Sequence, residues 1–140
     1  MSSGSARFAV AVHVLAVLGH LERAGVKLAS SDKIAMSVNT NAVVIRTLLR
    51  ALKKAGLVKS KEGQGGGVRL AKDPAKITLE EIYAAVENDR IFAPNDKPAF
   101  APCPVSRNMQ KVFGAVTSEV EAAVGKILKA RTLGQLLDRM

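Results

Sequence analysis

The side chains best suited to chemistry in this sequence are polar and basic groups that donate hydrogen bonds, and they gather in its first half. One set surrounds an Asn-Thr-Asn run and consists of Ser31, Asn39, Thr40, Asn41, Arg46, Thr47 and Arg50. A second set flanks a glycine-rich run and consists of Lys59, Lys61 and Gln64. Amides, hydroxyls and arginines hydrogen-bond to base edges and phosphates, so both sets predict contacts with nucleic acid.

Catalytic chemistry has almost no support in the sequence. There is no nucleophile beside a general base, no paired carboxylates, and neither of the phosphate-binding patterns GxxxxGK[ST] and GxGxxG. The two histidines have no cysteine or carboxylate at ligand spacing, so no metal site is expected. The sequence therefore predicts a binding protein, with no enzyme activity and no cofactor.

The net charge of +9 arises entirely in the first half of the chain. Residues 1–72 carry twelve basic and three acidic side chains, whereas residues 73–140 carry nine of each. A field of one sign confined to one surface is what a polyanion-binding face requires, and lysines spread for solubility would not produce it. Double-stranded DNA is the predicted partner.

One apolar stretch, residues 8–18, superficially resembles the core of a signal peptide. A histidine interrupts it, no clean small-residue cleavage site follows, and it falls short of the ~20 residues that span a bilayer. We expect a buried first helix, no membrane partner and a cytoplasmic location.

The elements that position the polar residues follow from apolar spacing and capping signals. Helices are expected over residues 5–23, 32–37 and 42–55, with a short strand at 26–29 and the Asn-Thr-Asn run as a turn. The expected buried stripe of the third helix is Val44, Ile45, Leu48, Leu49 and Leu52. Beyond Gly56 the apolar period becomes two, which predicts a hairpin of strands 57–60 and 68–71. Together these elements form the pattern of a winged helix-turn-helix, whose longer basic helix enters the major groove.

The second half predicts two further capped helices and one long one. Thr78 with Glu81 opens a helix to residue 86, and Thr132 with Gln135 opens a short terminal helix. Four of the five prolines fall in residues 88–104, which predicts a loop, and Pro104 begins a long helix to about residue 130. The apolar seam of this helix is the predicted dimer interface and includes Val105, Met109, Val112, Val116, Val120 and Ile127.

The predicted fold class is mainly α with a small β-hairpin: a winged helix-turn-helix plus a long C-terminal dimerisation helix. The DNA-binding domain is expected over residues 1–87, the loop over 88–104, and the dimerisation and terminal helices over 105–140. The same seam could also pack within one chain, although few elements remain to cover it.

Several runs of this sequence resemble a known family over nearly the whole chain. The most specific are KKAGLVKS, GGGVRLAKDP and ITLEEI. They are similar to the Rrf2-type regulators, which are bacterial winged-helix transcription factors. The resemblance implies a homodimer, related by two-fold symmetry through the long helix, in which each protomer reads half of a palindromic operator.

Two departures from that family qualify the resemblance. Family members that bind an iron–sulphur cluster carry three cysteines in the loop before the long helix, whereas this chain has Cys103 alone, at what resembles the position of the third. One thiolate per protomer does not hold a cluster, so the chain resembles a cluster-free branch. In addition, Arg46 stands where the iron–sulphur-cluster regulator has a glutamate, which implies a different target sequence.

Cys103 is also a candidate redox switch. It immediately precedes Pro104 and lies close in sequence to Arg107, and a helix N-terminus and a guanidinium both favour a reactive thiolate. The alternative is an inert cap residue. An effector, either a small molecule or a redox signal, is left open by the sequence.

Three functions compete. The leading one is a sequence-specific DNA-binding transcriptional regulator, a repressor, acting as a homodimer. A second is an interaction module that docks a metabolic enzyme through the electrically neutral second half, and a third is a non-specific DNA-binding protein.

Overall fold

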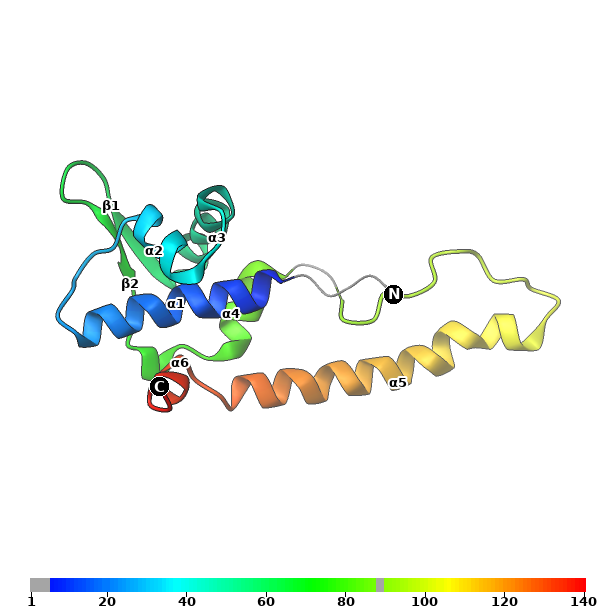
Figure 1. The fold of residues 1–140 in the computed structure, drawn as a ribbon. Coiled ribbons are helices and arrows are strands. Elements are labelled where there is room, and N and C mark those ends of the chain that lie inside the picture. The colour runs from blue at the N-terminus through cyan, green and yellow to red at the C-terminus, as the bar shows by residue number, and fades with distance from the viewer. Residues whose placement is uncertain (1–5, 88–89) are drawn as a thin grey trace. The chain divides into compact units, whose positions relative to one another are not determined.

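The computed structural model describes residues 6–87 and 90–140 and divides into two compact units. The first unit comprises the described residues of Met1–Asn88 and Leu128–Met140, and the second those of Asp89–Ile127. In chain order (Figure 1) the elements are α1 (Arg7–Arg23), α2 (Ser31–Val38), α3 (Ala42–Lys54), β1 (Val58–Lys61), β2 (Gly67–Leu70), the 3-10 turn η1 (Pro74–Lys76), α4 (Leu79–Val86), α5 (Pro104–Lys129) and α6 (Leu133–Leu137). This mainly helical architecture with an antiparallel hairpin confirms the predicted fold class.

The hydrophobic core of the described chain lies in the first unit. Its centre is formed by fully buried side chains from four helices, with Leu15 on α1, Ile34 on α2, Ile45 on α3 and Ile82 on α4. Each of these helices buries one apolar stripe and leaves its polar side in water, which is the usual way in which amphipathic helices pack. The core therefore fixes which face of α3 is left exposed.

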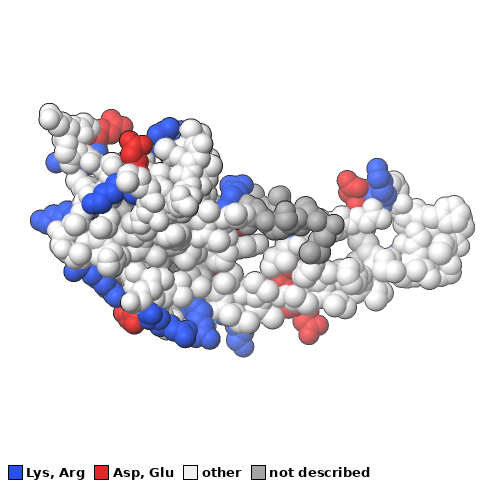
Figure 2. All heavy atoms as spheres, in the orientation of Figure 1, with Lys and Arg blue, Asp and Glu red and all other residues white. Residues whose placement is uncertain are grey.

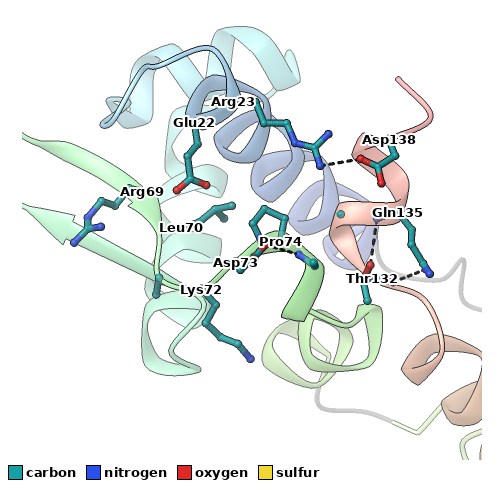
Figure 3. A pocket seen from close by; sticks show the side chains of 13 residues that line it. Glu22, Arg23, Arg69, Leu70, Lys72, Asp73, Pro74, Thr132, Gln135 and Asp138 are labelled. Atoms are coloured by element: carbon teal, nitrogen blue, oxygen red, sulfur yellow. Dashed lines mark hydrogen bonds and ion pairs between the residues drawn. The ribbon is translucent and has the colours of Figure 1, made fainter.

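The terminal helix α6 completes this same unit. Leu133 is fully buried, and its N–H donates to the carbonyl of Ile77 at 2.8 Å. Gly19 of α1 lies so close to α6 that an added Cβ would sit 2.6 Å from Leu137 Cδ1. Thr132 and Gln135 form the predicted capping box (Figure 3), which is thereby confirmed. The described chain thus belongs to the first unit up to residue 87 and again from residue 128. The predicted domain boundaries remain a prediction.

A charged hollow lies where α1, the segment after β2 and α6 meet (Figure 3). Arg23 pairs with Asp138 at 2.9 Å across this hollow, and the Asp73 carboxylate accepts from the N–H of Ala75. The Arg23–Asp138 pair joins the beginning of the unit to its end.

The predicted strand over residues 26–29 is wrong. The structure has only a single antiparallel bridge there, between Ala29 and Val68, closed by two backbone hydrogen bonds of 2.8 and 3.0 Å. Gly67 permits this approach, because a Cβ at that position would lie 2.7 Å from the Ala29 carbonyl oxygen. The bridge fastens the segment before α2 to the hairpin.

The capping box predicted at Thr78 forms only by half. The Thr78 hydroxyl accepts from the N–H of Glu81 at 3.1 Å, as expected at a helix N-terminus. The Glu81 carboxylate accepts from the Thr78 hydroxyl at 3.5 Å and pairs with Lys72, whose Nζ lies 2.7 Å away. The helix α4 begins where the sequence predicted, but the Glu81 side chain forms these contacts in place of the second capping bond.

The second unit consists of the segment from residue 90 and most of α5. Residues 90–103 have no regular secondary structure, and α5 starts at Pro104 as predicted. Arg90 pairs with Glu121 at 3.0 Å, and the N–H of Phe100 donates to the Ser106 hydroxyl at 2.7 Å, so the segment is tied to the helix at two places. None of the described helices is long and apolar enough to cross a membrane.

Candidate nucleic-acid interface

A rigid turn joins α2 to α3 and fixes the start of α3. Ser30 caps α2 by accepting from the N–H of Lys33, and Asn39 ends it in the left-handed conformation with φ of 58°. Asn41 then caps α3, with its Oδ1 accepting from the N–H of Val43 at 2.7 Å. Since the Asn41 oxygen is engaged in the cap, its amide N–H groups are what this residue can offer to a phosphate or a base.

The helix α3 separates an apolar face from a polar one. Its buried side chains are Ile45, Leu48, Leu49 and Leu52, as the sequence predicted. Val44, predicted in the same stripe, is 42% exposed, because α3 carries more apolar residues than its core face can cover. Arg46, Thr47 and Arg50 are all exposed.

The remaining predicted residues of this region differ in their exposure. Ser31 opens α2 and is half-buried, and Thr40 in the turn is also half-buried. Asn39 and Asn41 are exposed. The residues predicted from the sequence therefore lie on α2, on α3 and on the turn between them, although Ser31 and Thr40 are less exposed to solvent than the others.

The wing, defined here as residues 58–70, presents its basic side chains on one face. Lys59 lies directly opposite Arg69 in the register of β1 and β2, and Lys61 follows two residues later on the same side. Val58 and Leu70 form the opposite, buried face. Like charges directly opposite one another destabilise a hairpin, so this pairing is unfavourable unless an anion lies against it.

Arg69 is a candidate contact that the sequence reasoning missed. It is exposed, and only the pairing register brings it beside Lys59. The alternation of Val68, Arg69 and Leu70 within β2 was the available signal for an outward basic residue. Gln64 is exposed in the loop at the tip of the wing.

The wing loop is an ordered turn. The N–H of Gly66 donates to the carbonyl of Gly63 at 3.0 Å, and an added Cβ at Gly66 would lie 2.1 Å from the Lys61 carbonyl oxygen. At the base of the wing, Lys53 of α3 donates to the Ser60 hydroxyl at 2.7 Å. The hairpin and α3 are therefore held together by both core packing and a direct hydrogen bond. In Figure 1, α2, α3 and the wing loop lie toward the same side of the first unit.

The cations of α3 and the wing form no ion pair within 4 Å in the described chain. Its three ion pairs within 4 Å join Arg23 to Asp138, Lys72 to Glu81 and Arg90 to Glu121, and none uses a basic residue of α3 or the wing. In the view of Figure 2, Lys and Arg outnumber Asp and Glu over the winged-helix unit. This interface therefore keeps its positive charge for an external anion.

The seam predicted for the long helix is exposed along α5. Its side chains are 41–64% exposed, namely Val105, Met109, Val112, Val116, Val120 and Ile127. Phe113, beside them, is 58% exposed. Contiguous exposed apolar side chains of this kind mark an interaction surface.

Cys103 lies half-buried directly before α5, and its carbonyl accepts from the N–H of Arg107 at 3.0 Å. It lines a cavity of about 600 Å³ within the second unit, together with Phe92, Met109 and Phe113. No groups of three or more His, Cys, Asp or Glu side chains that could hold a metal ion occur among the described residues.

Comparisons with known proteins agree on one family. The sequence profile of the Rrf2 family, described as iron-dependent transcriptional regulators, matches residues 4–139. The chain is 35% identical over 137 residues to YwnA of Bacillus subtilis (strain 168), which is named as an HTH-type transcriptional regulator. The matched region covers 97% of this chain and 98% of that protein.

Two solved structures share the fold. IscR of T. potens has a TM-score of 0.74 at 24% identity, covering 98% of this chain and 87% of that one. CymR (YrzC), the global cysteine regulator of B. subtilis, has a TM-score of 0.72 at 22% identity, covering 100% and 99%.

Proposed function

This chain belongs to the Rrf2 family of DNA-binding transcriptional regulators, and from that premise we propose that it is a repressor that binds a palindromic operator as a homodimer in the cytoplasm. It is a regulator rather than an enzyme. The observation that carries the proposal is the pair of exposed arginines, Arg46 and Arg50, on the outward side of α3, with no carboxylate partner in the described chain. Arginine is the residue most often used to read guanine in the major groove.

We assign the two parts of the interface different tasks. The residues of α3 and of the turn before it would contact bases and the nearest phosphates, namely Asn39, Thr40, Asn41, Arg46, Thr47 and Arg50. The wing would follow the backbone through Lys59, Lys61, Gln64 and Arg69, and Ser31 would meet a phosphate at the start of α2. This division is supported by the wing's unpaired like charges, which a nearby phosphate would stabilise.

The homodimer is proposed from the seam of α5. Six aliphatic or sulphur-containing side chains stand exposed at helical spacing, and a second copy of the same seam would cover them isologously. Two-fold symmetry then places two α3 helices on two half-sites, so a palindromic operator follows from the geometry of the dimer. A dimer seated across a promoter would exclude polymerase, which is the simplest route to repression.

The residues present do not fit an iron–sulphur cluster. The family profile is described as iron-dependent, yet the chain contains one cysteine, and clusters are held by several thiolates. Cys103 alone would give two thiolates even to a dimer. We therefore propose that this member regulates without a cluster.

The experiment that tests the proposal is selection of bound fragments from genomic DNA, followed by footprinting of the enriched fragments. The expected result is one inverted repeat whose half-sites lie one helical turn or a multiple of it apart, together with reduced in-vitro transcription from the adjacent promoter. Equal recovery of all sequences would show a non-specific DNA-binding protein instead. If the protein retained a metabolic enzyme from a lysate and enriched no DNA fragment, the interaction module would be favoured.

A further inference from the structure

The outward face of α3 carries an apolar side chain beside its polar and basic ones. Val43 is 60% exposed in the first turn of α3, one residue after the helix begins. The backbone of Val43 is held in place, because its N–H donates to the Asn41 Oδ1 cap at 2.7 Å. The residues one and two turns further along the same face, Thr47 and Arg50, are exposed as well.

Thr47 extends this apolar surface. Its hydroxyl donates to the carbonyl of Val43 at 3.0 Å, so the only hydrogen of that hydroxyl is directed at the backbone of its own helix. The exposed side chain then has its methyl group and oxygen lone pairs to offer. Val43 and Thr47 therefore form a short apolar strip between the Asn41 cap and Arg50.

Thymine is the base that an apolar strip in the major groove can distinguish, because its C5-methyl group is the apolar feature that the groove presents. Side chains four apart on a helix have Cβ atoms about 5–6 Å apart. Successive bases along a strand are separated by about 3.4 Å, so such a pair spans one or two base steps.

We propose that Val43, supported by Thr47, reads a thymine methyl group in each half-site and is a specificity-determining residue of this regulator. The inference rests on the proposed function, since it requires α3 to enter the major groove. It adds an apolar contact to the hydrogen bonds of Arg46 and Arg50. The preferred half-site then contains a thymine whose methyl group contributes to affinity independently of base pairing.

The test uses deoxyuridine, which differs from thymidine only by the missing methyl group. Each thymidine of the selected operator is replaced singly, and the affinity of the full-length protein is measured by fluorescence anisotropy at fixed salt. One position per half-site is expected to lose about fourfold in affinity, the value of one buried methyl group. With Val43→Ala, the same replacement is expected to change affinity less than twofold.

Val44→Ala is the matched control, since it makes the same change at the neighbouring exposed valine, which lies off the outward face. This variant is expected to keep the fourfold response to deoxyuridine. Thermal unfolding checks that both variants remain folded.

The outcomes separate the inference from its premise. If a palindromic site is selected but no thymidine position responds through Val43, the methyl contact is overturned and the proposed function stands. If no sequence is preferred, the proposed function fails, and the methyl contact with it. The assignment would also be overturned if Val44→Ala lost the fourfold response to deoxyuridine while Val43→Ala kept it.

Discussion

Arg46 and Arg50 are the side chains whose removal should change which DNA is chosen. Arg46→Ala is expected to leave the fold of α3 intact, because the side chain is exposed and is not among the buried residues of the helix. A bidentate arginine–guanine contact is worth roughly 1–3 kcal/mol of discrimination, so the operator should weaken about 5- to 150-fold while random DNA weakens far less. The ratio of the two dissociation constants at one salt concentration measures this effect. An unchanged ratio would remove Arg46 from base recognition.

Lys61 should behave in the opposite way, because the wing is assigned to the phosphate backbone. Lys61→Ala is expected to weaken operator and random DNA by the same factor and to lower the slope of log affinity against log salt by about 1. Titrations of both duplexes at several salt concentrations give the slope. Glu62→Ala, the neighbouring change of opposite charge, should not weaken binding. A loss confined to the operator would reassign Lys61 to base contact.

Cys103 stays a predicted redox switch. It is half-buried, stands directly before α5 and lines the cavity of the second unit, so an oxidised or adducted sulphur would change the polarity and shape of that cavity. Peroxide is expected to change operator affinity several-fold in the natural protein and to leave Cys103→Ser unaffected. Both proteins should bind equally under reducing conditions. An identical response of both to peroxide would identify Cys103 as an inert residue.

The wing depends on a turn that tolerates no side chain at Gly66. In Gly66→Ala the new Cβ would meet the Lys61 carbonyl at 2.1 Å, so the loop must rearrange and carry Lys61 and Gln64 with it. We expect DNA affinity to fall about as far as in Lys61→Ala, with little change in the unfolding temperature, because the tip is exposed. Gly125→Ala is the control, since nothing lies within 4 Å of its added Cβ and alanine favours a helix by ~1 kcal/mol. Undiminished binding by Gly66→Ala would show that the wing does not contact DNA.

Local signals predicted most of these elements from the sequence. Asn41 caps α3, Gly56 follows its end with φ of 78°, and Thr132 opens α6, each as expected. Such signals act over a few residues, because a cap or a left-handed glycine satisfies backbone groups within a single turn. The long helix starting at Pro104 was predicted by the same reasoning.

The features that sequence reasoning missed depend on distant contacts. Only tertiary packing decides that, of residues 26–29, Ala29 alone forms a backbone bridge to the hairpin, and that Val44 is left outside the core. The register that places Arg69 opposite Lys59 is equally non-local. The individual site residues assigned from the sequence stay predictions, since their contacts require DNA.

The proposed dimer is the property of the whole molecule on which the proposed recognition of a palindrome depends. Val116→Asp would bury a charge in the proposed interface, and an uncompensated buried charge costs several kcal/mol. The variant is expected to sediment as a monomer at concentrations where the natural protein is a dimer, and to lose the operator while keeping weak binding to single half-sites. Ala122→Asp, exposed but off the seam, should remain dimeric. A dimeric Val116→Asp protein would locate the interface elsewhere.

The placement of α6 on α1 has a consequence for how the protein is made. The DNA-binding unit lacks two buried leucines, Leu133 and Leu137, until the ribosome has synthesised and released residues 128–140. By then residues 89–127 have necessarily been synthesised as well. A prematurely terminated nascent chain therefore has no complete DNA-binding unit with which to occupy an operator, and every chain that completes this unit already carries α5, the proposed dimerisation helix.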